Sequence, residues 1–156
     1  MFADIGCYTL GALPPYNAIF SCVDMGASIT MAKGASDAGL NPTVAVIGDS
    51  TFCHSGVTSL FDCVMENTPI TIMILDNSTT GMTGGQKSHG VGRLESICLG
   101  LGVEKEHIHI LNPLPNNHKH NTNIIKQELN YKGVSVIIPQ RECVQTLKRR
   151  LRKQRK

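Results

Sequence analysis

The chain has 156 residues, which suits one domain and leaves little room for a second. Hydrophobic residues make up 41% and aromatic residues only 4%, so we expect a core built on aliphatic side chains. The net charge of +3 comes from the C-terminus, because residues 148–156 carry seven of the fifteen basic side chains and no acidic one. The rest of the chain is mildly acidic, which disfavours nucleic acid as a partner.

The six cysteines form no C-x-x-C pair, which disfavours a zinc site or an iron–sulfur cluster held by this chain alone. The sequence shows no signal peptide, and its apolar runs are too short to span a membrane. We therefore expect a cytoplasmic protein with reduced thiols and no membrane partner. Cys53, Cys63 and Cys98 are expected to be core thiols.

The first ten residues run directly into a glycine-containing segment, and we expect no strand there. Residues 25–38, rich in Ala, Met and Gly, predict a closely packed helix that Gly39 ends. A β-rich run over 43–47 predicts a strand, and apolar residues at helical spacing predict a helix over 55–67.

Residues 70–75 are apolar except for Thr71 and predict a buried parallel strand, whereas the Gly, Ser and Thr of residues 78–92 predict a long loop. The remaining predicted elements are a helix over 94–101, a strand over 107–111, a helix over 121–131, a strand over 134–138 and a basic helix to the end. This alternation predicts an α/β fold, a mostly parallel sheet with helices on both faces. We expect one domain over residues 1–143 and a basic tail over residues 144–156.

Polar residues follow two of the predicted strands, as Gly48-Asp49-Ser50-Thr51 and as Asp76-Asn77-Ser78-Thr79. Ligands of open α/β sheets bind at the carboxyl ends of the strands. Magnesium prefers hard oxygen ligands that it shares with phosphates and water, and a helix N-terminus binds phosphate. Because Gly-Asp turns are common at strand ends, the residues alone indicate a candidate phosphate–metal site and no more.

Gly48-Asp49, followed 28 positions later by Asn77, resembles the thiamine diphosphate motif. A closer resemblance, over residues 3–143, is to the large subunit of the indolepyruvate ferredoxin oxidoreductases. The matching segments are Asp4-Ile5-Gly6-Cys7-Tyr8-Thr9-Leu10-Gly11, Met25-Gly26-Ala27-Ser28-Ile29, Val46-Ile47-Gly48-Asp49-Ser50-Thr51-Phe52, His54-Ser55-Gly56, Ile74-Leu75-Asp76-Asn77 and Met82-Thr83-Gly84. The resemblance implies the thiamine diphosphate-binding domain fold.

The resemblance also implies which residues bind the cofactor. Magnesium would be held by the side chains of Asp49 and Asn77 and by the carbonyl of Thr79. The diphosphate would be held by Gly48, Ser50 and Thr51. The middle of the cofactor and its pyrimidine side would be lined by Gly6, Cys7, Gly26 and Ala27. The thiazolium or the substrate would face Met82 and Thr83.

The chemistry of this family is the oxidative decarboxylation of aryl 2-oxoacids. Electrons pass to 4Fe-4S clusters and ferredoxin, and coenzyme A takes the acyl group. The family's activating glutamate lies on a pyrimidine-binding domain and its clusters on a cysteine-rich domain, and neither motif occurs in this chain. We therefore expect both on partner chains, in an oligomer. No catalytic residue is assigned; the candidates are Cys7, His54 and Met82.

Two other functions remain open. The chain is either a split-enzyme subunit or a non-catalytic, truncated remnant that retains the fold; the missing domains favour the remnant and the Asp49/Asn77 pair opposes it. A subunit of a non-redox thiamine-dependent 2-oxoacid decarboxylase is a third hypothesis, opposed by the motif over residues 4–11. A separate metal site is a further possibility, formed by His107, His109, His118 and His120.

Overall fold

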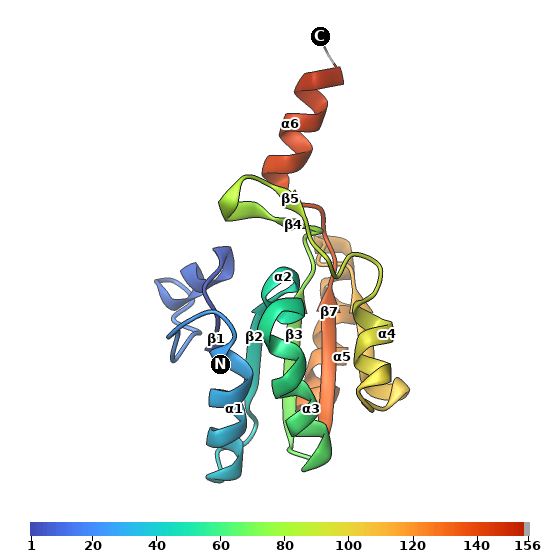
Figure 1. The fold of residues 1–156 in the computed structure, drawn as a ribbon. Helices are drawn as coiled ribbons and strands as arrows, with labels where there is room; N and C mark the ends of the chain where they lie inside the picture. Colours follow the sequence, from blue (N-terminus) through green and yellow to red (C-terminus); the bar gives the residue numbers. More distant parts are fainter. Residues whose placement is uncertain (155–156) are drawn as a thin grey trace.

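A parallel sheet forms the centre of the molecule, whose computed structural model describes residues 1–154 (Figure 1). Five strands lie in the order β1-β2-β3-β7-β6, and every neighbouring pair is parallel. Their bounds are β1 (Phe2–Ala3), β2 (Val44–Gly48), β3 (Ile70–Leu75), β6 (Ile108–Leu111) and β7 (Val134–Pro139). The predicted α/β class with a mostly parallel sheet is confirmed.

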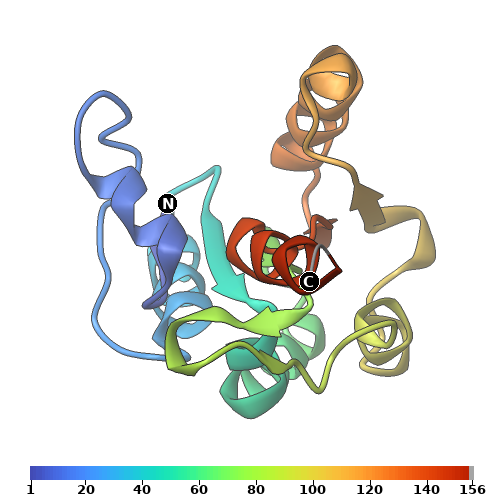
Figure 2. The same cartoon turned by 90° about the horizontal axis from the view of Figure 1, so that it is seen from above.

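Helices cover both faces of the sheet, unevenly (Figures 1 and 2). One face carries α1 (Ala27–Asp37), α3 (Val57–Met65) and α4 (Leu94–Gly100). Their buried side chains, such as Ile29, Leu60 and Cys98, join the apolar residues of β2, β3 and β7 in the main core. The other face carries α5 (His118–Asn130), whose Leu129 packs against a smaller cluster that includes Val44.

The strand β1 contradicts our expectation that the first residues contain no strand. Phe2 and Ala3 pair with Ala45 and Val46 of β2, and both are buried. Two residues are too short to show the alternating pattern of a strand. Pairing with β2 and burial of the Phe2 ring in the main core create this strand, so only the tertiary structure reveals it.

The helix expected over 55–67 begins earlier, at the end of β2. A helical turn α2 (Asp49–Thr51) leads through a π-helical turn (Phe52–Gly56) into α3. The residues of the strand-end motif therefore form the first turn of a helix, as phosphate binding at a helix N-terminus requires. The helix α1 ends as expected, with Gly39 in the left-handed region at φ 93°.

The segment expected to be a loop over residues 78–92 contains a small hairpin. The strands β4 (Thr79–Thr80) and β5 (Gln86–Lys87) pair antiparallel around a 3-10 turn (Gly81–Thr83). Successive glycines at positive φ, Gly84 and Gly85, reverse the chain between them. The hairpin lies above the carboxyl ends of the sheet, beneath the last helix, α6 (Val144–Gln154), which projects from the body (Figures 1 and 2).

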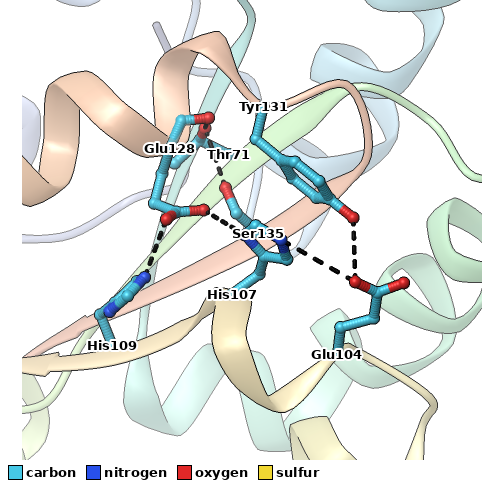
Figure 3. Close-up of polar contacts among 7 residues, drawn as sticks. All are labelled: Thr71, Glu104, His107, His109, Glu128, Tyr131 and Ser135. Atoms are coloured by element: carbon cyan, nitrogen blue, oxygen red, sulfur yellow. Dashed lines mark hydrogen bonds and ion pairs between the residues drawn. The ribbon is translucent and has the colours of Figure 1, made fainter.

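A buried carboxylate ties the edge strand β6 to α5 (Figure 3). The Glu128 side chain is 0% exposed; its Oε2 lies 2.8 Å from His107 Nδ1 and its Oε1 lies 2.8 Å from His109 Nε2. Tyr131 stacks on the His107 ring, with centroids 3.4 Å apart. Within residues 1–154 we find no group of three or more His, Cys, Asp or Glu side chains arranged to hold a metal ion.

No helix among residues 1–154 combines the length and the apolar character needed to cross a membrane.

Candidate functional site

Two strand ends meet at one edge of the sheet, where Gly48 of β2 lies opposite Leu75 of β3. Asp49 and the pair Asp76-Asn77 therefore leave neighbouring parallel strands at the same level. The Ser50 and Thr80 hydroxyls lie 2.8 Å apart, which brings β4 of the hairpin onto the first turn of the helix. The structure thus brings together the two motifs that the sequence placed 28 positions apart.

Asp49 carries an unpartnered carboxylate oxygen at this edge. The residue is 3% exposed, and its Oδ2 atom is buried with no hydrogen-bond partner within residues 1–154. Burial raises the pKa of Asp49, and the nearby Asp76 acts in the same direction, while hydrogen bonds from Ser88 and Ser50 oppose the shift. An unpaired buried carboxylate oxygen is costly, and a bound cation offsets that cost.

Asn77 and Thr79 lie in a tight turn beside Asp49. Asn77 Oδ1 accepts a hydrogen bond of 3.0 Å from the Thr79 N–H, across Ser78 at a positive φ of 61°. This side-chain turn fixes where the amide points, and its oxygen keeps a second lone pair for another donor or a cation. The Thr79 hydroxyl donates to the Gln86 carbonyl, which ties the turn to the hairpin.

The first turn of the helix after β2 presents backbone donors. Ser50 and Thr51 lie at its N-terminus, directly after Asp49. The first N–H groups of a helix have no carbonyl partner within the helix, so they are available to an anion. The Ser50 side chain is half-buried and the Thr51 side chain is buried. The groups available to an anion at this turn are therefore mainly backbone N–H groups.

The N-terminal segment runs beside the end of β2. Tyr8 Oη accepts a hydrogen bond of 3.0 Å from the Gly48 N–H. Gly6 donates its N–H to Thr9 Oγ1 at 3.0 Å, and the Thr9 hydroxyl donates to the Asp4 carbonyl at 2.8 Å. These bonds fix the turn that carries Gly6 and the exposed Cys7 next to Gly48.

Asp4 links that turn to the start of α1. Its Oδ1 accepts a hydrogen bond of 2.7 Å from the Ser28 N–H, and its backbone N–H donates to Val46. Burial raises the pKa of Asp4, partly opposed by the Ser28 hydrogen bond. Gly26 precedes α1 at φ 107° and packs against Ser55, so a side chain there would collide. Asp4 and Tyr8 belong to the motif over residues 4–11, but the sequence predicts no role for either residue.

Within the described part of the chain, two other candidate residues make hydrogen bonds only with close sequence neighbours. Thr83 is exposed, and its hydroxyl donates to Gln86 Oε1 at 3.0 Å, within its own hairpin. His54 is exposed in the π-helical turn, where its Nδ1 lies 3.3 Å from Ser55 Oγ. The side chain of Met82 lies outside the part of the chain that the structure describes.

The cysteines divide into buried and accessible groups. Cys63 and Cys98 are core residues as expected, and burial raises the pKa of each thiol to about 12. Cys53 is partly buried against the same core. Cys143, which precedes α6, has a lowered pKa because the Thr146 backbone N–H bonds to its sulfur. Its own N–H lies 3.3 Å from the Asn77 carbonyl, so α6 begins beside the site.

Comparison with known families identifies the domain that contains this edge. Residues 4–138 match the family model of the thiamine pyrophosphate enzyme, C-terminal TPP binding domain. The chain belongs to this family. The match contains every motif residue from Asp4 to Thr83, so the strand-end cluster lies inside a TPP-binding domain.

Curated relatives of this TPP-binding domain carry one name. Indolepyruvate oxidoreductase subunit IorA of Archaeoglobus fulgidus is 38% identical over 152 residues, which cover 90% of this chain and 24% of that protein. The subunit of the same name from Thermococcus kodakarensis is 34% identical, covering 90% of this chain and 25% of that protein. The chain thus spans about a quarter of the length of the relatives that it matches.

Solved structures share the fold of the TPP-binding domain. The 2-oxoglutarate:ferredoxin oxidoreductase of Magnetococcus marinus matches with a TM-score of 0.69 and 18% identity, over 91% of this chain and 53% of that one. Benzoylformate decarboxylase of Polynucleobacter necessarius matches with a TM-score of 0.61 and 17% identity, over 91% and 30%. At these identities the likeness establishes the fold alone.

Proposed function

We propose that this chain forms the diphosphate and Mg²⁺ half of the active site in an indolepyruvate-type 2-oxoacid:ferredoxin oxidoreductase that acts on aryl 2-oxoacids. The observation that carries the proposal is the buried, unpartnered Oδ2 of Asp49 at a strand end, one parallel strand away from Asn77. Similarity to the IorA subunits supports the reaction class.

The residues at this edge fit the metal and the diphosphate. The Asp49 carboxylate, the Asn77 amide oxygen and the Thr79 carbonyl are hard oxygen donors of the kind that Mg²⁺ prefers, and they leave positions for phosphate oxygens and water. The diphosphate would be held by Gly48, Ser50 and Thr51, where the helix N–H groups begin. The metal ion and the helix N-terminus together would neutralise part of the negative charge of the diphosphate.

The rest of the cofactor would extend from this edge along the N-terminal segment. Its middle and pyrimidine side would be lined by Gly6, Cys7, Gly26 and Ala27, which Asp4 holds in one unit. Thr83 and Met82 of the hairpin would face the thiazolium or substrate. When bound, thiamine diphosphate supplies the nucleophilic carbon for decarboxylation, and the protein supplies geometry and electrostatics.

We further propose that partner chains complete the site. Several large apolar side chains of the N-terminal segment are exposed: Met1, Ile5, Leu10, Leu13, Tyr16, Phe20, Val23 and Met25. A surface of this kind marks an interface, and it borders the proposed pyrimidine side of the cofactor. A partner bearing the pyrimidine domain and its activating glutamate would cover it.

The electron-transfer half of the reaction also needs partners. An iron–sulfur chain with 4Fe-4S clusters would pass electrons to ferredoxin, and coenzyme A would accept the acyl group. All six cysteines of this chain are free, which supports a reducing, cytoplasmic location. We also propose that residues 1–143 form the cofactor-binding domain and that residues 144–156 form a basic tail.

Affinity purification of the tagged chain from its native host tests the function. The purified complex is analysed for iron and thiamine diphosphate and assayed with indolepyruvate, coenzyme A and a viologen acceptor. Acceptor reduction that requires both the 2-oxoacid and coenzyme A supports the proposal. Carbon dioxide release by an iron-free complex supports the non-redox decarboxylase instead. A chain recovered without cofactor, partner or activity is a non-catalytic remnant.

A further inference from the structure

The end of the β1–β2 ladder leaves one backbone donor that Tyr8 satisfies. The ladder pairs Ala3 with Val46, and its last bond runs from the Asp4 N–H to the Val46 carbonyl. Gly48 presents the next N–H on the same side of β2, but the chain has already turned away at Gly6. The Tyr8 hydroxyl oxygen takes the place of the missing carbonyl, 3.0 Å from the Gly48 nitrogen.

The Tyr8 hydroxyl keeps its own proton for another acceptor. A phenol has one O–H donor in addition to its acceptor lone pairs. Within residues 1–154 this O–H donates no hydrogen bond, and the Oδ2 atom of Asp4, whose charge acts on Tyr8, is also without a partner. The ring lies directly over Gly6, where a Cβ would overlap it, so the hydroxyl is held in place.

The hydroxyl acts as a donor at every physiological pH. Burial raises the pKa of Tyr8 well above its usual value, and the negative charge of Asp4 acts in the same direction, while the hydrogen bond from Gly48 opposes them. A protonated phenol at this edge donates a hydrogen bond and does not accept a proton. A hydroxyl donor at the end of β2 would offset part of the repulsion between the Asp4 carboxylate and an approaching anion.

We propose that the Tyr8 hydroxyl donates a hydrogen bond to a phosphate oxygen of the bound cofactor, while the Gly48 N–H donates to Tyr8. This inference rests on the proposed function, because it needs a phosphate ligand beside Gly48, Ser50 and Thr51. It adds a binding residue from the N-terminal segment to the diphosphate site. The same bond couples the end of β2 to the turn that carries Gly6 and Cys7.

Titration calorimetry of Tyr8→Phe tests the proposal with three probes: Mg²⁺ alone, Mg²⁺ with inorganic pyrophosphate, and Mg²⁺ with thiamine diphosphate. Removing a hydrogen bond to a charged group weakens binding by roughly 10- to 100-fold, and we expect Tyr8→Phe to lose this much affinity for both phosphate ligands. Its affinity for Mg²⁺ alone should be unchanged. Tyr16→Phe is the matched control, since Tyr16 is 75% exposed in the same segment. We expect it to bind all probes as the unaltered protein does.

Each other outcome has a definite meaning. Unchanged affinity of Tyr8→Phe for both phosphate ligands overturns the Tyr8 proposal and leaves the proposed function intact. No pyrophosphate or cofactor binding by the unaltered protein overturns both. If Tyr8→Phe does not fold, ¹³C-tyrosine NMR of the unaltered protein decides. The chain has three tyrosines, and pyrophosphate must shift the Tyr8 signal but not those of Tyr16 and Tyr131; an unmoved Tyr8 signal overturns the proposal.

Discussion

Asp49 and Asp76 follow the neighbouring strands β2 and β3 at the same level of the sheet, but they differ in their hydrogen-bond partners. Asp76 Oδ1 accepts the Ser78 N–H at 2.9 Å, and its Oδ2 accepts Gln140 Nε2 at 2.9 Å. Asp49 Oδ2 has no partner within residues 1–154, and Asp76 adds to the rise in its pKa. One carboxylate of the pair is therefore built into the protein structure, and the other is available to a cation.

Replacing Asp49 by Asn should stabilise the protein in the absence of ligand. The amide has no charge to desolvate, and we expect a gain of about 1 kcal/mol in the free energy of unfolding. Because the folded pKa of Asp49 is raised, the unaltered protein loses stability as pH rises from about 4 through the raised value, whereas Asp49→Asn lacks this loss. Urea unfolding between pH 4 and pH 8 measures it, with the exposed Asp24→Asn as control. Equal pH profiles for Asp49→Asn and the unaltered protein would contradict the burial argument.

Binding of Mg²⁺ with thiamine diphosphate should weaken as pH falls through the raised pKa of Asp49. A metal requires the ionised carboxylate, so protonation competes with binding, and this competition starts at a higher pH than for an ordinary aspartate. Calorimetry from pH 8 down to pH 5 checks the trend. Buffers of different ionisation enthalpy report the number of protons released on binding, which includes those of the ligand's own phosphate as well as that of Asp49. An affinity independent of pH throughout this range excludes Asp49 as the ligand.

Cys7 should lose its reactivity when the cofactor binds. Its thiol is exposed beside the Gly6 turn, and the proposed cofactor would cover it. We expect iodoacetamide to modify Cys7 several-fold more slowly with saturating Mg²⁺ and thiamine diphosphate, measured by peptide mass spectrometry. Cys63 and Cys98 should react only in denaturant. Unprotected Cys7 in the saturated protein removes it from the proposed cofactor lining.

Glu128→Ala should destabilise the fold without changing cofactor binding. The substitution leaves His107 and His109 without their shared acceptor and is expected to cost roughly 3–5 kcal/mol. The cluster joins β6 to α5 beside Thr71 at the start of β3, at the opposite end of that strand from Asp76 and Asn77 (Figure 3). Thermal unfolding and cofactor titration measure the two effects separately. Glu106→Ala, at an exposed position of the adjacent turn, should change stability by no more than about 0.5 kcal/mol. If Glu128→Ala unfolds at the same temperature as the unaltered protein, the hydrogen bonds from Glu128 to His107 and His109 do not stabilise the fold.

Repeating local patterns made most of the fold predictable from the sequence. Residues 70–75 are apolar except for Thr71 and form β3 with the expected bounds, and Gly39 ends α1. The two-residue β1 was missed because only its pairing with β2 creates it. Likewise, no local pattern marks Glu128 as a buried partner of His107, since 21 positions separate them.

The candidate site was predictable to a similar extent. The spacing of Asp49 and Asn77 indicates a shared sheet edge because one strand–helix–strand unit returns the chain to the neighbouring strand. The sequence does not reveal that Asn77 Oδ1 bonds the Thr79 N–H, or that Tyr8 reaches Gly48 across 40 positions. Such contacts depend on side-chain directions that only the folded chain defines. All assignments of individual residues to the cofactor or to the metal stay predictions, including those of Asp49 and Asn77.

Calorimetric titration of thiamine diphosphate into the purified chain, with Mg²⁺ and then with EDTA, tests the central claim most directly. We predict saturable binding that requires Mg²⁺ and is lost in Asp49→Ala, because this substitution removes the only side-chain carboxylate from the proposed ligand set. Binding that persists in EDTA, or an Asp49→Ala protein that binds as the unaltered chain does, would contradict the assignment of this edge as the diphosphate–magnesium site.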